Sequence, residues 1–285
     1  MSKRKLILLT VLILAAIVAA GTLYFRQARL SQNAVPPPSE QASLLPAASD
    51  NPEPSPVQQA PDPAELAKRP PVYVSIFMYH EVGEGPNNLY LAEKNLYAQM
   101  KYLHDNGFQT ITMARAREML ANKEDMTGKV VLTFDDGYKS FYNTVWPVLK
   151  EFNQTATLYV ISDLVGNDRY VTWEQVKILA DNGIEIGGHT KTHPLLARID
   201  PDLLDDEISG GKREIEAHIE RPITSFCYPT GSYNRQVIAK VKEAGYETAT
   251  TMESGKASSK DDPFLLPRWG VFKQESLSVF VAHCE

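Results

Sequence analysis

From residue 71 onward, short apolar segments alternate with amphipathic segments along the chain. The apolar segments have the length and composition of strands, and most of them are followed by residues with helical periodicity. The strand candidates are residues 72–79, 108–112, 129–134, 156–161, 184–188, 224–228, 246–251 and 265–271. Repeated strand–helix units predict a parallel sheet covered by helices. Seven or eight such units in about 215 residues favour a closed barrel over the alternative, an open doubly wound sheet.

The starts of two helices are marked by capping residues. Thr172 and Gln175 stand in the order of a capping box, which predicts a helix over residues 173–183. Asn234 precedes the amphipathic stretch 236–245 as an N-cap. Further helices are expected over 92–107, 114–122 and 276–284, and from residues near Tyr138 and Pro201.

The N-terminal segment has the features of a membrane anchor. Leu6–Phe25 is a run of 20 residues without a charge, and Lys3-Arg4-Lys5 precede it. A helix of that length spans a hydrocarbon core of about 30 Å, and the basic flank should stay on the cytoplasmic side. We therefore expect residues 1–26 to be an uncleaved anchor, although a cleaved signal peptide is the alternative. The rest of the chain would then lie on the extracytoplasmic side of the cell membrane, or be secreted if the segment is cleaved.

Residues 27–70 are rich in Pro, Ala and Ser and show no hydrophobic periodicity. Proline removes backbone donors and favours extended conformations, so this segment is predicted to be a semi-rigid linker. Residues 71–285 are predicted to be the catalytic domain.

The charge and the cysteines restrict the partners. The formal net charge is -6, and no Lys/Arg-rich run follows residue 26. A body of this charge argues against nucleic-acid binding. Cys227 and Cys284 lack zinc-type spacing, and we expect buried or free thiols, with their pairing left open. The sequence indicates no protein partner or oligomeric interface.

Polar residues follow the predicted strands. These segments are His80-Glu81, Asp135-Asp136-Gly137, His189 to His193, Pro229 to Tyr233, and Arg268-Trp269. In a parallel α/β barrel the carboxyl ends of the strands share one face, and that face carries the active site. The five segments are therefore expected to converge.

Two of these segments have metal-site chemistry. His189 and His193, four residues apart, supply with one carboxylate three protein ligands of the kind that leave positions open for water and substrate. A pair of solvated loop histidines is the alternative for this spacing alone. Asp135 and Asp136 can divide the work of a metal hydrolase, in which one acid binds the cation and the other accepts a proton. The alternative is an Asp-Gly turn, which requires only one acid.

The motifs TFDDGY (133–138), HTKTHP (189–194) and YPTGSYN (228–234) together resemble those of polysaccharide deacetylases that carry the NodB homology domain. The resemblance runs from about Val72 to near Cys284, with the motifs in the family's order. It implies a distorted parallel (β/α) barrel. It also implies removal of N-acetyl groups from N-acetylglucosamine-type units of an extracellular or cell-wall polysaccharide.

The resemblance assigns roles position by position. Asp135 matches the catalytic base, and Asp136, His189 and His193 match the ligands of a divalent metal, commonly zinc. The pair Tyr79-His80 resembles the branch that includes deacetylases of poly-β-1,6-N-acetylglucosamine, in which this histidine lies in the active site. Arg268 matches the arginine that orients the catalytic aspartate there.

The third motif departs from the family pattern R-P-P-Y-G. Here it reads C-Y-P-T-G, so Cys227 replaces the arginine and Thr230 replaces the aromatic residue. The backbone N–H at Thr230 is still expected to contribute to an oxyanion hole. Substrate contacts are expected from Tyr228, Pro229, Thr230 and Gly231, with Tyr233 or Trp269 in place of the missing aromatic side chain.

Two other functions stay open at this point. One is a metal-dependent amidase acting on another amide substrate. The other is a glycan-binding barrel without catalytic activity, although every polar group that the mechanism requires is present. His283, His104 and His218 lie on predicted helices, where structural or surface roles are expected.

Overall fold

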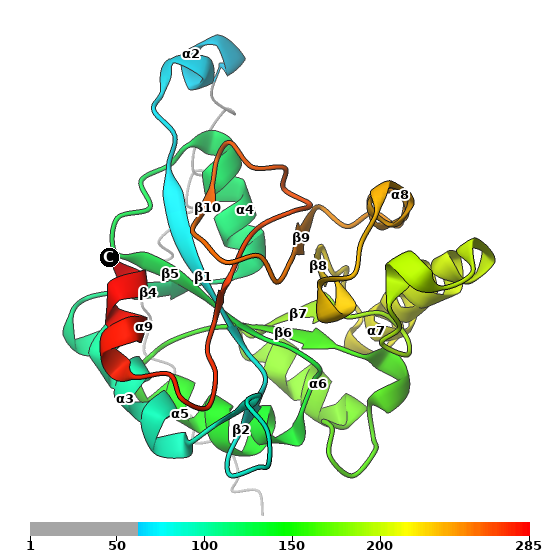
Figure 1. Ribbon diagram of the computed structural model, residues 1–285, viewed down its shortest axis with the longest axis horizontal. Helices are drawn as coiled ribbons and strands as arrows, with labels where there is room; N and C mark the ends of the chain where they lie inside the picture. Colours follow the sequence, from blue (N-terminus) through cyan, green and yellow to red (C-terminus); the bar gives the residue numbers. More distant parts are fainter. Residues whose placement is uncertain (1–61) are drawn as a thin grey trace, which may run out of the picture. The chain divides into compact units, whose positions relative to one another are not determined.

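The predicted strands form one curved sheet in the computed structural model, which describes residues 62–285 (Figure 1). The strands pair in the order β10 (Ala257–Ser258), β1 (Tyr73–Tyr79), β5 (Lys129–Phe134), β6 (Thr157–Val160), β7 (Glu185–Gly188), β8 (Ser225–Cys227) and β9 (Thr248–Thr250). All of these pairs are parallel except β10 with β1. The strands β4 (Gln109–Ile111) and β11 (Trp269–Gly270) add parallel pairs to β5 and β1. The predicted parallel α/β sheet is confirmed.

The two ends of this sheet are connected through the segment that leads into β11. Thr250 of β9 forms a parallel bridge with Leu266, and the Leu266 N–H donates to the Ala249 carbonyl at 3.0 Å. Three residues later β11 pairs with β1, with Trp269 opposite Phe77. Backbone pairing therefore continues from β9 to β1, and the sheet curves back on itself as in a barrel. Of the predicted last strand, 265–271, only the bridge at Leu266 and the two residues of β11 have strand pairing.

Helices follow most of the strands. The helices in the described residues are α2 (Pro63–Lys68), which precedes β1, and then α3 (Glu93–Asp105), α4 (Met113–Asn122), α5 (Trp146–Glu151), α6 (Trp173–Asp181), α7 (Gly211–Ile219), α8 (Arg235–Glu243) and α9 (Leu277–Cys284). Thr172 and Gln175 form the predicted capping box, and the Asn234 side chain caps α8. The helix expected from Pro201 begins with a 3-10 turn and a π-helical turn before α7. A separate short parallel pair, β2 (Glu81–Val82) with β3 (Tyr90–Leu91), follows β1.

Both faces of the sheet are buried, as expected for parallel strands. Val74, Ile76 and Val131 point to the inside of the curve, where they join Tyr159 and Cys227. Alternate residues of the same strands point outward and pack under the helices, among them Phe77, Leu132 and Leu158. On this outer side α3 packs against α5 and α9, and α6 packs against α7 (Figure 1). This packing holds the carboxyl ends of β1, β5, β7 and β8 at one edge.

The predictions for the N-terminal part have different outcomes. Leu6–Phe25, the expected anchor, lies outside the described residues, as does most of the expected linker. Within 62–285, no helix has the length and apolar character needed to cross a membrane. The last part of the expected linker instead forms α2, which Asp62 caps and which Lys123 holds by donating from Nζ to the Leu66 carbonyl at 2.7 Å.

Candidate active site

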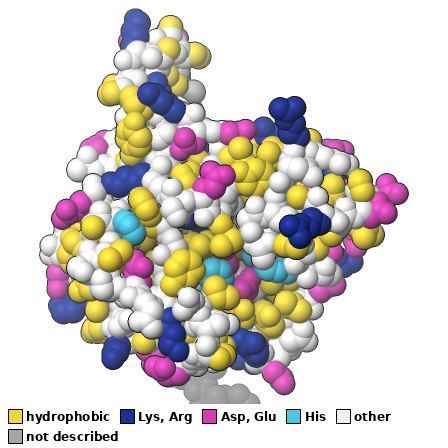
Figure 2. All heavy atoms as spheres, viewed as in Figure 1, with side chains coloured by type: hydrophobic (Ala, Val, Ile, Leu, Met, Phe, Trp, Pro, Cys, Tyr) yellow, Lys and Arg dark blue, Asp and Glu magenta, His cyan; other side chains and the backbone are white. Residues whose placement is uncertain are grey.

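Most of the side chains predicted to converge do so at the carboxyl edge of the sheet, and Trp269 is the exception. His80 follows β1, the acid pair follows β5, and His189 follows β7 directly. Cys227 ends β8, and Arg268 precedes β11, which lies beside β1. Histidine and acidic side chains gather near the middle of the face seen in Figure 2, among hydrophobic side chains.

Asp136, His189 and His193 form a compact ligand set. Their ligand atoms all lie within 4.8 Å of one another, and Nε2 of each histidine is 3.4 Å from Asp136 Oδ1. Two ligands that hold one cation at about 2.1 Å in tetrahedral geometry are about 3.4 Å apart, so these separations fit a first-row divalent metal. Asp136 and His189 are buried, whereas the His193 side chain is 29% exposed, which leaves one side of the set accessible.

The orientation of His189 is fixed by its other ring nitrogen. Nδ1 lies 2.8 Å from the Cys227 carbonyl oxygen, an acceptor, so Nδ1 carries the proton and donates. The lone pair is then on Nε2, which faces Asp136. A hydrogen bond of this kind to a backbone carbonyl is the usual support of a metal-binding histidine.

The backbone around these ligands is unusually strained. Asp136, Thr190 and His193 have φ values of 74°, 65° and 65°. Residues other than glycine adopt this region rarely, and such positions concentrate at functional sites. The Thr190 hydroxyl accepts a hydrogen bond from the His193 N–H at 2.9 Å, and this bond holds the turn between Thr190 and His193. Gly211 of α7 permits close packing here, because a Cβ atom at that position would lie 3.0 Å from the Thr190 carbonyl carbon.

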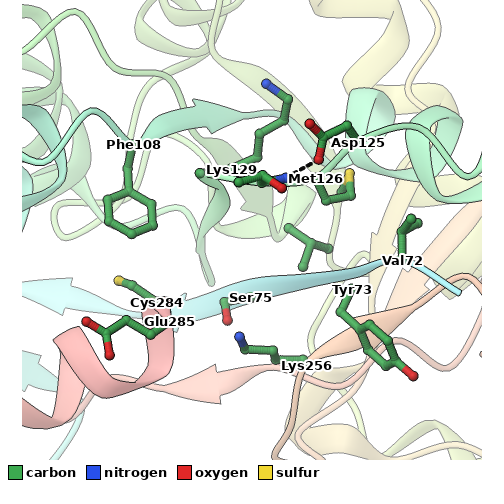
Figure 3. A pocket seen from close by; sticks show the side chains of 13 residues that line it. Val72, Tyr73, Ser75, Phe108, Asp125, Met126, Lys129, Lys256, Cys284 and Glu285 are labelled. Carbon is green, nitrogen blue, oxygen red and sulfur yellow. Dashed lines mark hydrogen bonds between the residues drawn. The ribbon is translucent and has the colours of Figure 1, made fainter.

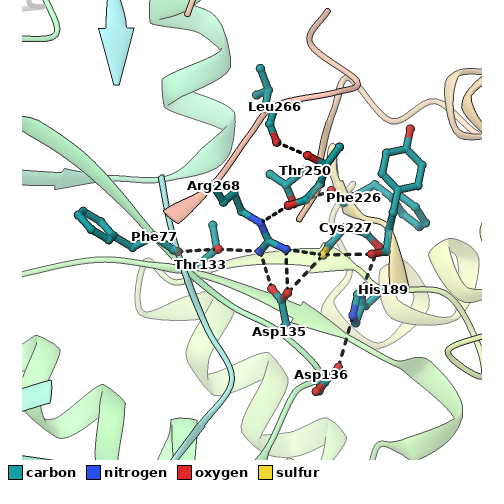
Figure 4. A network of polar contacts seen from close by, with 12 residues as sticks. Phe77, Thr133, Asp135, Asp136, His189, Phe226, Cys227, Thr250, Leu266 and Arg268 are labelled. Atoms are coloured by element: carbon teal, nitrogen blue, oxygen red, sulfur yellow. Dashed lines mark hydrogen bonds and ion pairs between the residues drawn. The ribbon is translucent and has the colours of Figure 1, made fainter. Parts of the chain in front are cut away.

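Asp135 is paired with Arg268 rather than with the histidines (Figure 4). Arg268 Nη1 donates to Asp135 Oδ1 at 2.7 Å and Nη2 donates to Oδ2 at 2.9 Å, while the Arg268 side chain is fully buried. Thr133 and Thr251 hold the guanidinium by accepting from Nη1 and Nε at 2.9 and 3.0 Å. Burial by itself would raise the pKa of Asp135, but the charge and hydrogen bonds of Arg268 hold it well below its ordinary value.

Cys227 contacts both members of this pair. Its sulfur accepts from Arg268 Nη2 at 3.2 Å and its thiol lies 3.5 Å from Asp135 Oδ2. The ligand atoms of Asp135, His189 and Cys227 also lie within 4.8 Å of one another, close enough to hold a metal ion. Arg268 already bonds both oxygens of Asp135, and its positive charge would repel a cation, so we favour the set with Asp136. Both cysteines are free and buried, as expected.

His80 is the remaining polar side chain from the N-terminal strand. Its Nδ1 is buried and has no hydrogen-bond partner within the described part of the chain. Burial lowers the pKa of His80, and the charges of Asp135 and Asp136 partly oppose this effect. His80 is therefore mainly neutral near pH 7 and readily gives up a proton once it has gained one.

The predicted substrate-contacting residues are divided between two places. Tyr228 and Pro229 are buried, whereas Thr230 is exposed and has a φ of 52°, and Gly231 and Tyr233 are half-buried on the same loop after β8. Trp269 is not brought to this edge. Its ring stacks on His283 of α9, with centroids 3.9 Å apart, because neighbouring residues on β11 face opposite sides and Arg268 takes the inner one.

The other histidines lie on helices, as expected. His283 stacks on Trp269, His218 of α7 stacks on Trp173 at 3.9 Å, and His104 is on the exposed side of α3. Within residues 62–285, none of these three histidines belongs to a group of side chains that could hold a metal ion.

A pocket of about 550 Å³ lies at the opposite end of the strands (Figure 3). Ser75 and Lys129 from the first halves of β1 and β5 line it, together with Lys256 and Cys284. It contains none of the residues of the metal-binding set or of the Asp135–Arg268 pair. The chemistry is therefore concentrated at the carboxyl edge and not in this pocket.

The sequence did not reveal the contacts of Cys227 or two tyrosines beside Asp136. Tyr138 directly follows the Asp-Asp-Gly turn, and its ring stacks on Tyr170 with centroids 5.3 Å apart. The position of Tyr138 next to the acid pair was an available signal, whereas Tyr170 lies in a segment without a recognisable motif.

Comparison with known proteins agrees with this site. Residues 122–249 match the family model described as polysaccharide deacetylase. The chain is 36% identical over 216 residues to Bacillus subtilis (strain 168) YxkH, whose name describes a polysaccharide deacetylase, and the match covers 75% of this chain and 77% of that protein. It is 26% identical over 239 residues to the poly-β-1,6-N-acetyl-D-glucosamine N-deacetylase of Escherichia coli (strain K12), which covers 66% of this chain and 35% of that protein.

A solved structure shows the same fold. The Streptococcus pyogenes deacetylase PplD in complex with acetate matches with a TM-score of 0.73 and 26% identity, covering 76% of this chain and all of that one. A polysaccharide deacetylase from Bacillus cereus matches with a TM-score of 0.69 and 26% identity, over 75% of this chain and 70% of that one. With its acid pair, its histidine pair and this fold, the chain belongs to the polysaccharide deacetylase family.

Proposed function

We propose that this protein is a divalent-metal-dependent N-deacetylase that acts on N-acetylglucosamine-type units of a polysaccharide outside the cytoplasm. The observation that carries the proposal is the division of the acid pair. Asp136 faces two histidines at metal-ligand separations, while Asp135, one residue earlier, is held ionised by Arg268.

The substrate class is supported by the names of relatives. Besides the E. coli enzyme, a Bacillus cereus peptidoglycan-N-acetylglucosamine deacetylase is 32% identical over 120 residues, which are 42% of this chain and 54% of that protein. Both names specify an N-acetylglucosamine unit in a polymer, and the polymers differ. We extend to this chain only the sugar unit that they share.

Asp136, His189 and His193 would hold the cation. The cation would supply Lewis-acid chemistry by polarising the acetyl carbonyl and making a water molecule more acidic. Asp135 is the proton acceptor from that water, since its low pKa keeps it ionised and Arg268 fixes its orientation. The pairing of both Asp135 oxygens with Arg268 also keeps Asp135 out of the metal-binding set.

Two further groups complete the proposed reaction. The exposed turn at Thr230 would present its backbone N–H to the developing negative charge on the acetyl oxygen. The proton that Asp135 takes from the water has to reach the departing amine, and His80, at the end of β1, would relay it: as neutral imidazole it can accept the proton, and its lowered pKa makes it give the proton up readily.

We expect a chelator to abolish acetate release. The full chain in detergent should release acetate from N-acetylglucosamine oligomers or from peptidoglycan, and treatment with a chelator should reduce the rate at least about tenfold, with recovery on addition of Zn²⁺. A sample passed through the same buffer exchange without chelator is the control. Unchanged activity after chelation would overturn metal dependence. No acetate from any N-acetylated glycan in the presence of Zn²⁺ would overturn the deacetylase function itself.

We also propose that residues 1–26 anchor the protein in the cell membrane with residues 71–285 outside. The support is the 20-residue uncharged run after a basic start. Protease added to intact spheroplasts should then digest the domain, and peptides from residues 1–26 should be found in the membrane fraction by mass spectrometry. A domain that is degraded only after the spheroplasts are lysed would contradict this orientation.

A further inference from the structure

Two stacked tyrosines lie beside the metal-binding set and take no part in the reaction described above. Tyr138 comes two residues after Asp136, and Tyr170 comes from the segment between β6 and α6. Their ring centroids are 5.3 Å apart and their planes differ by 19°. Both side chains are half-buried, so part of the pair is open to solvent.

The backbone holds this pair in place. Tyr138 and Tyr170 form an antiparallel bridge, which is extended by hydrogen bonds on both sides. The Lys139 N–H donates to the Arg169 carbonyl at 2.8 Å, and the Val171 N–H donates to the Gly137 carbonyl at 3.0 Å. The rings are therefore presented by the same turn that presents Asp136, and little ordering is needed when a ligand contacts them.

Polar groups accompany the aromatic surface. The Arg169 guanidinium carbon is 5.4 Å from the centroid of the Tyr138 ring. Arg169 Nη2 donates to Glu81 Oε2 at 2.6 Å and to the Tyr90 hydroxyl at 2.9 Å. Because Glu81 follows His80 directly, this network connects the tyrosine pair to the end of β1 as well as to β5.

The pair lies close to the reacting centre, on one side of it. Only Gly137 separates Tyr138 from Asp136, and the backbone bridge from Tyr138 to Tyr170 holds the second ring beside the first. In the sheet, β6 and β8 flank β7, which carries the histidines. The tyrosine pair after β5 and β6 is therefore on the other side of the metal-binding set from the Thr230 loop after β8.

We propose that the Tyr138–Tyr170 pair is a binding subsite for the hexopyranose unit next to the one that is deacetylated. The C–H face of a pyranose ring is flat and apolar and packs on an aromatic ring, while the sugar hydroxyls require nearby hydrogen-bonding groups. Arg169, which lies over the Tyr138 ring, and its partner Glu81 supply such groups. The inference rests on the proposed function, since it requires that the substrate be a glycan chain.

The test compares a long and a short substrate. Tyr170→Ala should raise KM for the N-acetylglucosamine pentamer about tenfold, the scale of one lost aromatic contact, with kcat nearly unchanged. Its hydrolysis of a fluorogenic aryl acetate, which has no neighbouring sugar, should stay within twofold of the wild type. Tyr170→Phe keeps the ring and should behave as the wild type on both substrates.

The controls separate binding from folding. Tyr97→Ala is the matched control, because it removes another partly exposed tyrosine, one on helix α3 that bonds the carboxylate of Glu151. It should leave both the KM for the pentamer and the hydrolysis of the aryl acetate unchanged. If Tyr170→Ala does not fold, Tyr170→Leu preserves apolar bulk and should show the same selective rise in KM. If Tyr170→Ala lost activity equally on the pentamer and on the aryl acetate, or left the KM for the pentamer unchanged, the proposed subsite would be overturned. A wild-type protein inactive on the pentamer would instead overturn the proposed function.

Discussion

Asp135→Asn should abolish turnover without releasing the metal, whereas Asp136→Asn should release the metal. We expect the first variant to lose roughly 10²–10⁴-fold in kcat for acetate release, which is the contribution of a positioned general base. The second variant should lose activity as well, but through the absence of the cation, since it removes an anionic ligand 3.4 Å from both histidine Nε2 atoms.

The decisive measurement is metal content by elemental analysis, alongside acetate release and thermal unfolding. Asparagine is nearly the same size as aspartate, so both variants should fold. Asp135→Asn does leave Arg268 without its anionic partner, so its unfolding temperature must be reported with its activity. Metal lost equally from both variants would show that the assignment of base and ligand is wrong. A set formed by Asp135, His189 and Cys227 predicts the reverse pattern, with metal lost only from Asp135→Asn.

Arg268→Met should be the most destabilising single change at the site. It leaves the Asp135 carboxylate buried with its two strongest hydrogen bonds removed. Breaking a buried ion pair from one side costs about 3–5 kcal/mol of the free energy of unfolding. For a domain of this size that corresponds to a fall in Tm of about 6–20 °C. Activity should fall too, because Asp135 would lose both its orientation and its low pKa.

A matched control is available on the surface. Arg115 also bonds two carboxylates, Glu118 and Glu124, both at 2.6 Å, but its side chain is 43% exposed. Arg115→Met should therefore cost no more than about 1 kcal/mol. The double variant Asp135→Asn with Arg268→Met should be less destabilised than the sum of the single variants, because neither charge is left unpaired. Equal Tm values for Arg268→Met and Arg115→Met would contradict the proposed importance of the pair.

The same pair makes stability depend on pH. The pKa of Asp135 is lower in the folded state than in the unfolded chain. Its contribution is therefore complete above the unfolded pKa of about 3.9 and is lost as the pH falls through the lower, folded value. In Arg268→Met this contribution should be absent, so the difference in Tm between wild type and variant should narrow at acidic pH.

Much of the fold could be predicted because its signals are local. The capping box at Thr172 and Gln175 and the N-cap at Asn234 act within one helical turn, and the apolar runs of β1 and β5 are buried on both faces. The short helix α2 was not predicted although its start signals, the Asp62 cap and Pro63 at the first position, are local, because the Pro/Ala/Ser-rich composition of residues 27–70 indicated a linker. The closing segment near Leu266, by contrast, depends on a single bridge to β9.

The site shows the same division. The residue types and their spacing within TFDDGY and HTKTHP predicted which side chains would meet, and these do converge. Which of two adjacent acids faces the histidines was only implied by the family resemblance, and in the structure the positive φ of Asp136 turns it toward them. Trp269 was expected near the substrate, but the alternation of side chains along β11 turns it toward α9.

By itself, the sequence determined the strand–helix alternation, the polar ends of the strands and the chemical types of the ligands, because hydrophobic periodicity and short motifs act over a few residues. Only the tertiary structure decided that Arg268 pairs with Asp135, that the Cys227 carbonyl orients His189, and that Tyr170 stacks on Tyr138. Each of these contacts joins residues separated by 32 to 133 positions. Their geometry depends on how the strands are ordered around the sheet, which no local pattern specifies.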